Sequence, residues 1–267
     1  MTATFTVPTR HGATHVLTAG DPQQPPLVIF HGWGIHHAEA ALDWDFDRLA
    51  DHFYLICPDA PGHSGRSEAL DLPTKTDAYG EWCADVLEGL HIERAALAGN
   101  SGGAFMALKF AAYAPQRVIG LCLSNPSGIV GHWLTPIWVW AMLPVLIHPT
   151  ENTARRFVRL MNTAAMPAWQ QENFTHTLHH LYKQRKLMKY NPVPLSDADL
   201  RRLTMPLHIA LGEFRPICPL RALEKRVRAL CPHATLERLP DAGHILSADQ
   251  QSALVLTSVE RWTGRLI

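Results

Sequence analysis

The stretch Leu97-Ala98-Gly99-Asn100-Ser101-Gly102-Gly103 decides the fold. An apolar run ends in the pattern Gly-x-Ser-x-Gly, and residues 104–108 after it have the composition of a helix. A serine held between a strand and a helix lies in strained backbone and needs small residues two positions away on each side, which Gly99 and Gly103 supply. The first turn of such a helix also directs N–H groups toward the serine. The stretch therefore predicts a sharp turn that presents Ser101 as a candidate nucleophile.

Composition narrows the class of protein. The 267 residues are enough for one α/β domain with an insertion. Lysine and arginine together number 24, as do aspartate and glutamate, so the formal net charge is zero. This balance favours neither a nucleic acid nor a membrane as partner. We expect a small neutral or apolar molecule as substrate, without a cofactor or a metal, and we predict no oligomeric state.

Cysteine usage points to a reducing compartment. The five cysteines are odd in number and form no Cys-x-x-Cys pair, so we expect free, buried thiols; they are Cys57, Cys83, Cys122, Cys218 and Cys231. The first residues show no basic segment followed by an apolar one, as a secretory signal would require. A cytoplasmic location is therefore expected.

Apolar, strand-like runs alternate with helix-like stretches over most of the chain. The runs at 27–30, 53–57, 95–98, 118–123 and 207–211 are typical of strands buried on both faces, and a further strand is predicted at 235–239. Residues 4–7 and 13–18 predict an antiparallel hairpin at an edge. The sequence thus predicts an α/β fold, with a mostly parallel sheet and helices on both faces. The alternation stops in one long segment, so we expect a core domain of residues 1–126 and 202–267 and a helical cap of residues 127–201.

Polar residues follow the predicted strands where each strand ends. They are His31, Trp33, Asp59, Ser101, Asn125, Glu213 and His244. The carboxyl ends of parallel strands lie at one edge of a sheet, and ligands of such sheets bind there. We therefore expect these residues to converge on a catalytic site.

Several motifs, taken in order, resemble those of the α/β-hydrolase superfamily, and in particular of its bacterial carboxylesterases. They are His31-Gly32-Trp33-Gly34, the loop that begins at Pro58-Asp59, the turn at Ser101, and Asp241-Ala242-Gly243-His244. The resemblance implies that Ser101 is the nucleophile and His244 the general base, with the main-chain N–H groups of Gly102 and Trp33 as the oxyanion hole. It implies a serine hydrolase that cleaves a small apolar carboxylic ester through an acyl-enzyme.

The chain departs from the family pattern at the position of the third catalytic residue. Arg215 stands where the resemblance implies an acid, and a guanidinium cannot accept a proton from His244. Glu213, Asp59 and Asn125 are the alternatives for holding the imidazole. We name Glu213 the candidate acid, although the interpretation that we prefer for this residue is a carboxylate that braces its own loop.

Asn125 and Arg215 are candidate substrate contacts. In an alternative function, the triad is degenerate and the protein binds a ligand or performs lyase or cyclase chemistry, in which Arg215 contacts an anionic substrate.

The inserted segment contains an apolar stretch at 129–147. Two prolines and a histidine within it argue against a membrane span. We expect a cap helix over the site, with tryptophans that line a pocket or pack inside the cap. The histidines at 176, 179 and 180 have helical metal-ligand spacing, but no acid or cysteine close by completes a metal site.

Overall fold

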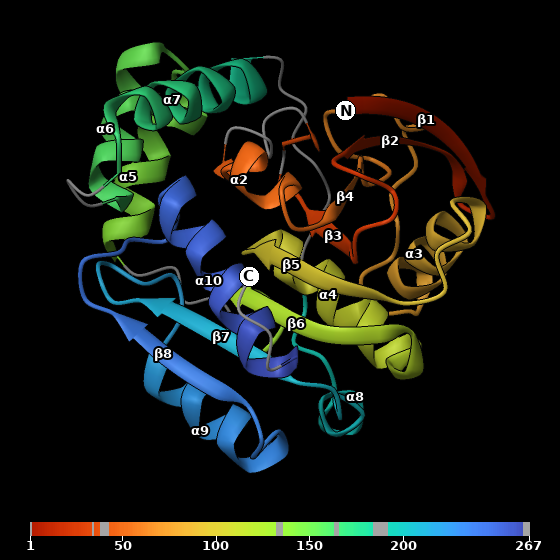
Figure 1. The fold of residues 1–267 in the computed structure, drawn as a ribbon. Coiled ribbons are helices and arrows are strands. Elements are labelled where there is room, and N and C mark those ends of the chain that lie inside the picture. Colours follow the sequence, from red (N-terminus) through yellow and green to blue (C-terminus); the bar gives the residue numbers. More distant parts are fainter. Residues whose placement is uncertain are drawn as a thin grey trace.

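The structure is a computed structural model that describes residues 2–33, 35–37, 43–131, 136–162, 166–183 and 192–263. Within these ranges one eight-stranded sheet has the order β1-β2-β4-β3-β5-β6-β7-β8 (Figure 1). The strands are β1 (Thr2–Thr9), β2 (Gly12–Ala19), β3 (Pro26–Phe30), β4 (Tyr54–Pro58), β5 (Ala95–Asn100), β6 (Val118–Ser124), β7 (Leu207–Gly212) and β8 (Thr235–Leu239). The pairs β1–β2 and β2–β4 are antiparallel and the other five pairs are parallel. The predicted edge hairpin and mostly parallel sheet are confirmed.

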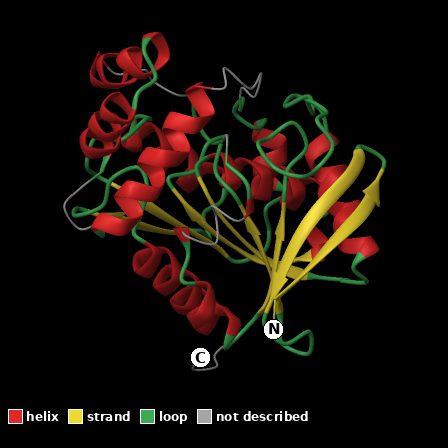
Figure 2. Cartoon of the chain, turned by 90° about the horizontal axis from the view of Figure 1, so that it is seen from above, coloured by secondary structure: helices red, strands yellow, loops and turns green. Residues whose placement is uncertain are grey.

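Helices cover both faces of the sheet, as predicted (Figure 2). The described helices of the core are α2 (Phe46–Ala50), α3 (Ala78–Gly89), α4 (Gly102–Tyr113), the short 3-10 helix η1 (Pro115–Arg117), α8 (Asp197–Arg201), α9 (Leu220–Leu230) and α10 (Ala248–Thr263). Side chains of α3, α4 and α9 form one apolar cluster with the sheet, and those of α2 and α10 form the other. Residues 38–42, before α2, lie outside the described residues.

Strand burial follows position in the sheet. Side chains of β7 and nearly all of β5 and β6 are buried, because helices pack on both sides of these central strands. The outer strand β1 exposes most of its side chains. All five cysteines are free and buried, as expected from their number and spacing.

Three helices of the inserted segment form a separate group beside the sheet (Figure 1). They are α5 (Pro136–Ile147), α6 (Glu151–Met161) and α7 (Ala168–Lys183). They pack on one another through a small apolar cluster that includes Val145, Phe157 and Leu181. Among the described residues, no helix is both long and apolar enough to cross a membrane.

Candidate active site

Ser101 lies in a strained turn between β5 and α4. Its φ of 50° and ψ of −110° are unfavourable for a residue with a side chain. The turn is tight, because a Cβ on Gly99 would lie 2.5 Å from the carbonyl carbon of Gly103, and a Cβ on Gly103 would lie 2.2 Å from the Phe30 oxygen. Only glycine fits at these two positions. The sequence pattern therefore has the steric cause predicted for it.

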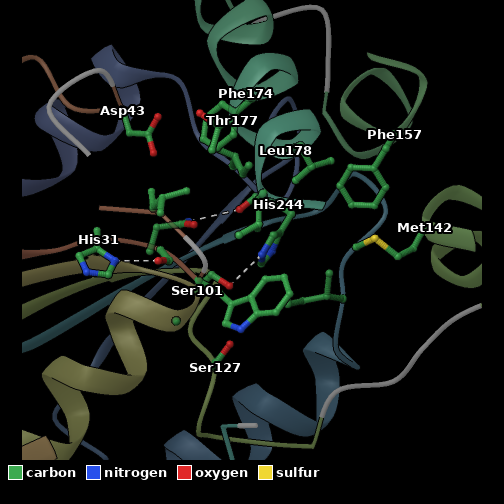
Figure 3. A pocket seen from close by; sticks show the side chains of 18 of the residues that line it. His31, Asp43, Ser101, Ser127, Met142, Phe157, Phe174, Thr177, Leu178 and His244 are labelled. Atoms are coloured by element: carbon green, nitrogen blue, oxygen red, sulfur yellow. Dashed lines mark hydrogen bonds between the residues drawn. The ribbon is translucent and has the colours of Figure 1, made fainter. Parts of the chain in front are cut away.

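His244 is directed at Ser101 (Figure 3). Its Nε2 lies 3.0 Å from Ser101 Oγ, which is hydrogen-bonding distance for transfer of the hydroxyl proton. The two residues are 143 positions apart in the chain, and the carboxyl edge of the sheet brings them together.

The main chain around His244 is held by two side-chain amides. Asn125 Nδ2 donates to the His244 oxygen at 2.9 Å and to the Gly243 oxygen at 3.1 Å, while Asn125 Oδ1 accepts from the N–H of Gly212 at 2.9 Å. Asn100 Nδ2 also donates to the His244 oxygen, at 3.2 Å. These bonds fasten the loop that contains His244 to the carboxyl ends of β5, β6 and β7.

The last turn of α6 provides a further support for this loop. The N–H of His244 donates to the Met161 oxygen at 3.3 Å. The two segments are in tight contact, because a Cβ on Gly243 would lie 2.5 Å from the Met161 oxygen. The position of His244 therefore depends on the inserted segment as well as on the core.

The two expected oxyanion donors are neighbours. A Cβ on Gly102 would lie 3.1 Å from the main-chain nitrogen of Trp33. Gly102 is the first residue of α4, so its N–H belongs to the positive end of that helix. The main chains of both residues thus meet beside Ser101, as an oxyanion hole requires.

Ser101 and His244 open into a cavity of about 660 Å³. Helices α5, α6 and α7 contribute mostly apolar side chains to its wall, among them Met142, Phe157, Phe174 and Leu178 (Figure 3). Trp33 and Gly102 also line it. Among the described residues the wall contains no lysine or arginine, and Asp43 is its one carboxylate. The cavity therefore suits a neutral, largely apolar ligand.

Of the other predicted site residues, His31 lines the cavity, whereas Asp59, Asn125, Glu213 and Arg215 lie outside its wall. Glu213 Oε1 accepts from Arg238 Nη1 at 2.8 Å, which braces its own loop. The Arg215 guanidinium donates to the Leu160 oxygen at 2.7 Å in the last turn of α6. Neither Glu213 nor Asn125 makes a hydrogen bond with the His244 ring. Glu213 binds Arg238, and the polar atoms of the Asn125 side chain bind main-chain groups. The role of Glu213 as the acid stays a prediction.

Asp59, the other alternative acid, is part of a separate buried cluster. Its Oδ1 accepts from both the N–H and the Nδ1 of His37, at 2.8 and 2.6 Å, and its Oδ2 accepts from the N–H of Arg66 at 3.0 Å. Burial by itself would raise the pKa of Asp59, but these hydrogen bonds lower it to about 2. The carboxylate stays ionised and joins the loops after β3 and β4.

His31 and His63 lie beside that cluster, with ring centroids 4.9 Å apart. Burial lowers the pKa of His31, and it holds the pKa of His63 well below its ordinary value. His31 Nδ1 donates to the Gly32 oxygen at 2.8 Å, and its Nε2 accepts from the N–H of Ala60 at 2.9 Å. A neutral His31 therefore fixes the loop that leads to Trp33.

One group within the described part of the chain has a spacing that could hold a metal ion. His36, His37 and Asp59 each bring one ligand atom within 4.8 Å of the others. The Asp59 oxygens already accept three N–H donors, so hydrogen bonds account for this arrangement. His176 instead lies near Glu151 and Glu172, at 3.7 and 3.4 Å.

Two supports of the site were missed from the sequence. Asn100 is the variable residue of the Gly-x-Ser-x-Gly pattern, so the pattern alone gave it no role. The contact of α6 with the His244 loop joins segments about 80 residues apart, and no local signal marks it. Trp140, which could have lined the pocket, instead faces solvent with 70% of its surface exposed.

The chain is similar to known proteins of one family. A model of the alpha/beta hydrolase family matches residues 27–256. The uncharacterized carboxylesterase Nap of Bacillus subtilis (strain 168) is 26% identical over 265 residues, covering 92% of this chain and 82% of the relative. A Pseudomonas sp. 2-hydroxy-6-oxononadienedioate/2-hydroxy-6-oxononatrienedioate hydrolase is 26% identical, covering 94% of this chain and 93% of its own length.

A solved structure has the same fold as this chain. The carboxylesterase CesB (YbfK) from Bacillus subtilis superposes with a TM-score of 0.80 at 22% identity, covering 99% of this chain and 93% of that one. Similarity at this level of identity supports the fold, and the family model extends over most of the chain. The chain belongs to the alpha/beta hydrolase family and is an enzyme of that fold.

Proposed function

We propose that the protein is a carboxylesterase that hydrolyses a small, apolar ester through an acyl-enzyme on Ser101. The observation that carries the proposal is the 3.0 Å distance between His244 Nε2 and Ser101 Oγ in an apolar cavity. A serine becomes a useful nucleophile when a neighbouring base can take its proton during attack. The carboxylesterase relatives in Bacillus subtilis support the same class of reaction.

In the proposed reaction, Ser101 Oγ attacks the ester carbonyl carbon while its proton passes to His244 Nε2. The N–H groups of Gly102 and Trp33 donate to the oxyanion, and losing one such donor typically costs about 3 kcal/mol. His244 then protonates the leaving alkoxide, which departs as an alcohol. A water molecule then attacks the acyl carbon while its proton passes to His244, and His244 returns that proton to Ser101 Oγ as the carboxylic acid is released.

His244 also has to be held in place. We propose that Asn125 acts as a positioning residue, because its amide binds the main chain of the His244 loop. This replaces the substrate contact expected of it from the sequence. Arg215 has no place in the cavity wall and donates to α6, so we do not assign it a substrate contact.

The cavity also bears on the class of substrate. The Pseudomonas relative is named for a dicarboxylate substrate. Among the described residues, this cavity has no cationic side chain to pair with a carboxylate. A neutral ester therefore fits better than a doubly charged acid.

Ester hydrolysis can be measured with p-nitrophenyl acetate and p-nitrophenyl butyrate, with Ser101→Ala as the control. We expect turnover by the wild type and none by the variant. Absence of turnover above the Ser101→Ala control would overturn the proposal. Labelling with a fluorophosphonate tests the alternative function. A Ser101 adduct in the absence of ester turnover would show that the serine is activated but that the protein binds a ligand or catalyses another reaction.

A further inference from the structure

Helix α5 leaves several large apolar side chains in contact with solvent. The exposed fraction is 70% for Trp140, 73% for Ile147, 50% for Leu143 and 47% for Leu146. Single exposed apolar residues are common, whereas a contiguous group marks a contact surface. Leu143, Leu146 and Ile147 follow Trp140 by three, six and seven positions, so the four side chains share one side of the helix, which we call the outer face of α5.

The outer face of α5 continues into the cavity. Ala141 and Val145 are buried and anchor the opposite side of the helix to α6 and α7. Val139, Leu143 and Leu146 line the cavity and are also exposed to solvent. An apolar surface therefore runs without interruption from the exterior of the protein to the chamber that contains Ser101.

Positive charge lies beside this apolar surface. The Arg156 guanidinium is 5.8 Å from the centre of the Trp140 ring, and both Arg156 and Arg159 are exposed on α6. By sequence, residues 127–201 contain eight lysines and arginines against four aspartates and glutamates, although the whole chain has 24 of each. The inserted segment is thus positive and the rest of the chain negative.

We propose that the outer face of α5 docks on an anionic lipid surface, with Arg156 and Arg159 facing the headgroups. Apolar side chains flanked by arginine are the features with which a helix lies in a lipid interface. The twelve residues of α5 are too few to cross a bilayer, so the helix lies in the plane of the interface. This proposal revises our expectation, drawn from the zero net charge, that a membrane is not a partner.

A second copy of the chain is a poorer occupant of the same surface. Two-fold pairing through the outer face of α5 would bring the same patch of each copy together. The arginines of two positive segments would then approach one another, which is unfavourable. An anionic lipid surface has the opposite charge and complements the patch.

Vesicle co-sedimentation tests this proposal with the full-length Ser101→Ala protein, so that the result does not depend on ester hydrolysis. Vesicles of phosphatidylcholine alone are compared with vesicles that contain about 30% phosphatidylglycerol. We expect binding to the anionic vesicles, weakened by added salt because the arginine contacts are screened. Vesicle binding does not rest on the proposed esterase function, because the Ser101→Ala protein lacks the proposed nucleophile.

Three variants locate the binding surface. Trp140→Ser/Ile147→Ser is expected to lower the partition coefficient at least about tenfold, and Arg156→Gln about fivefold on anionic vesicles only. Phe5→Ser is the matched control, because Phe5 is an exposed apolar residue on β1, and it should bind as the parent does. Thermal unfolding verifies that each variant is folded. If the double variant fails to fold, Ile147→Ser alone is measured, with an expected loss of about threefold.

The proposal is overturned by absence of binding to anionic vesicles, by binding that survives in Trp140→Ser/Ile147→Ser, or by an equal loss in Phe5→Ser. Sedimentation velocity supplies the remaining outcome: a dimer of the parent protein that the double variant separates into monomers would assign the outer face of α5 to a second copy.

Discussion

The guanidinium of Arg215 donates a hydrogen bond of 2.7 Å to the main-chain oxygen of Leu160. Leu160 lies in the last turn of α6, where carbonyl groups lack helical partners and carry a partial negative charge. Arg215 lies in the loop after β7 and has a positive φ of 49°. The position at which the resemblance implies a catalytic acid therefore carries a cation that fastens α6 to the loop after β7.

Two substitutions of Arg215 separate this structural role from catalysis. Arg215→Gln and Arg215→Asp both remove the charged hydrogen bond, so each should lower the free energy of unfolding by about 1–2 kcal/mol in urea titrations. Only Arg215→Asp supplies a carboxylate that can stabilise a protonated His244. Loss of that charge in a serine protease lowers kcat by ~10⁴. We therefore expect the kcat of Arg215→Asp to exceed that of Arg215→Gln by at least about tenfold. Equal kcat values would indicate that His244 is supported by another group.

Glu213→Gln discriminates between an acid and a loop brace. Because Glu213 pairs with Arg238 at the protein surface, we expect kcat to stay within about twofold and stability to fall by less than about 1 kcal/mol. Glu224→Gln is the matched control, since Glu224 is the other partner of Arg238. A fall in kcat of a thousandfold or more, on the scale of a lost triad acid, would instead assign Glu213 to catalysis.

The strained turn at Ser101 predicts sensitivity to one added methyl group. Gly103→Ala would place a Cβ 2.2 Å from the Phe30 oxygen, and we expect a loss of about 1–3 kcal/mol in unfolding free energy together with most of the activity. Gly131→Ala is the control, because a Cβ there meets no atom within 4 Å. Similar stabilities for the two variants would contradict the steric account of the turn.

Buried histidines predict a loss of stability in mild acid. Burial lowers the pKa of both His31 and His63, so below about pH 6.5 the unfolded chain binds protons that the folded protein resists. The free energy of unfolding should fall as the pH decreases from 7.5 to 5.5, by at most about 1.4 kcal/mol per pH unit for each histidine.

His63→Gln should reduce that pH dependence, and urea titrations at the two pH values measure it. An unchanged dependence would show that His63 protonates equally in both states. Asp59 does not change the free energy of unfolding in this pH range. Its pKa is about 2, so its stabilising contribution is lost only in more acidic solution, as the pH falls from the ordinary pKa of a carboxyl toward 2.

The sequence by itself determined the fold and which residues meet at the candidate site. Alternating apolar runs and helix patterns are local, and so is the spacing of Gly99, Ser101 and Gly103, which only a strand-to-helix turn satisfies. Residues at the ends of parallel strands meet at one edge for topological reasons, which brought His244 to Ser101.

Only the tertiary structure decided where the neighbouring side chains point. Glu213 pairs with Arg238 and Arg215 binds Leu160, and these partners are 25 and 55 positions away in the chain. Such choices depend on contacts between distant segments, which local patterns do not encode. The same reason applies to α5: its apolar sequence predicted a cap helix, but only packing separated the buried Val145 from the exposed Trp140.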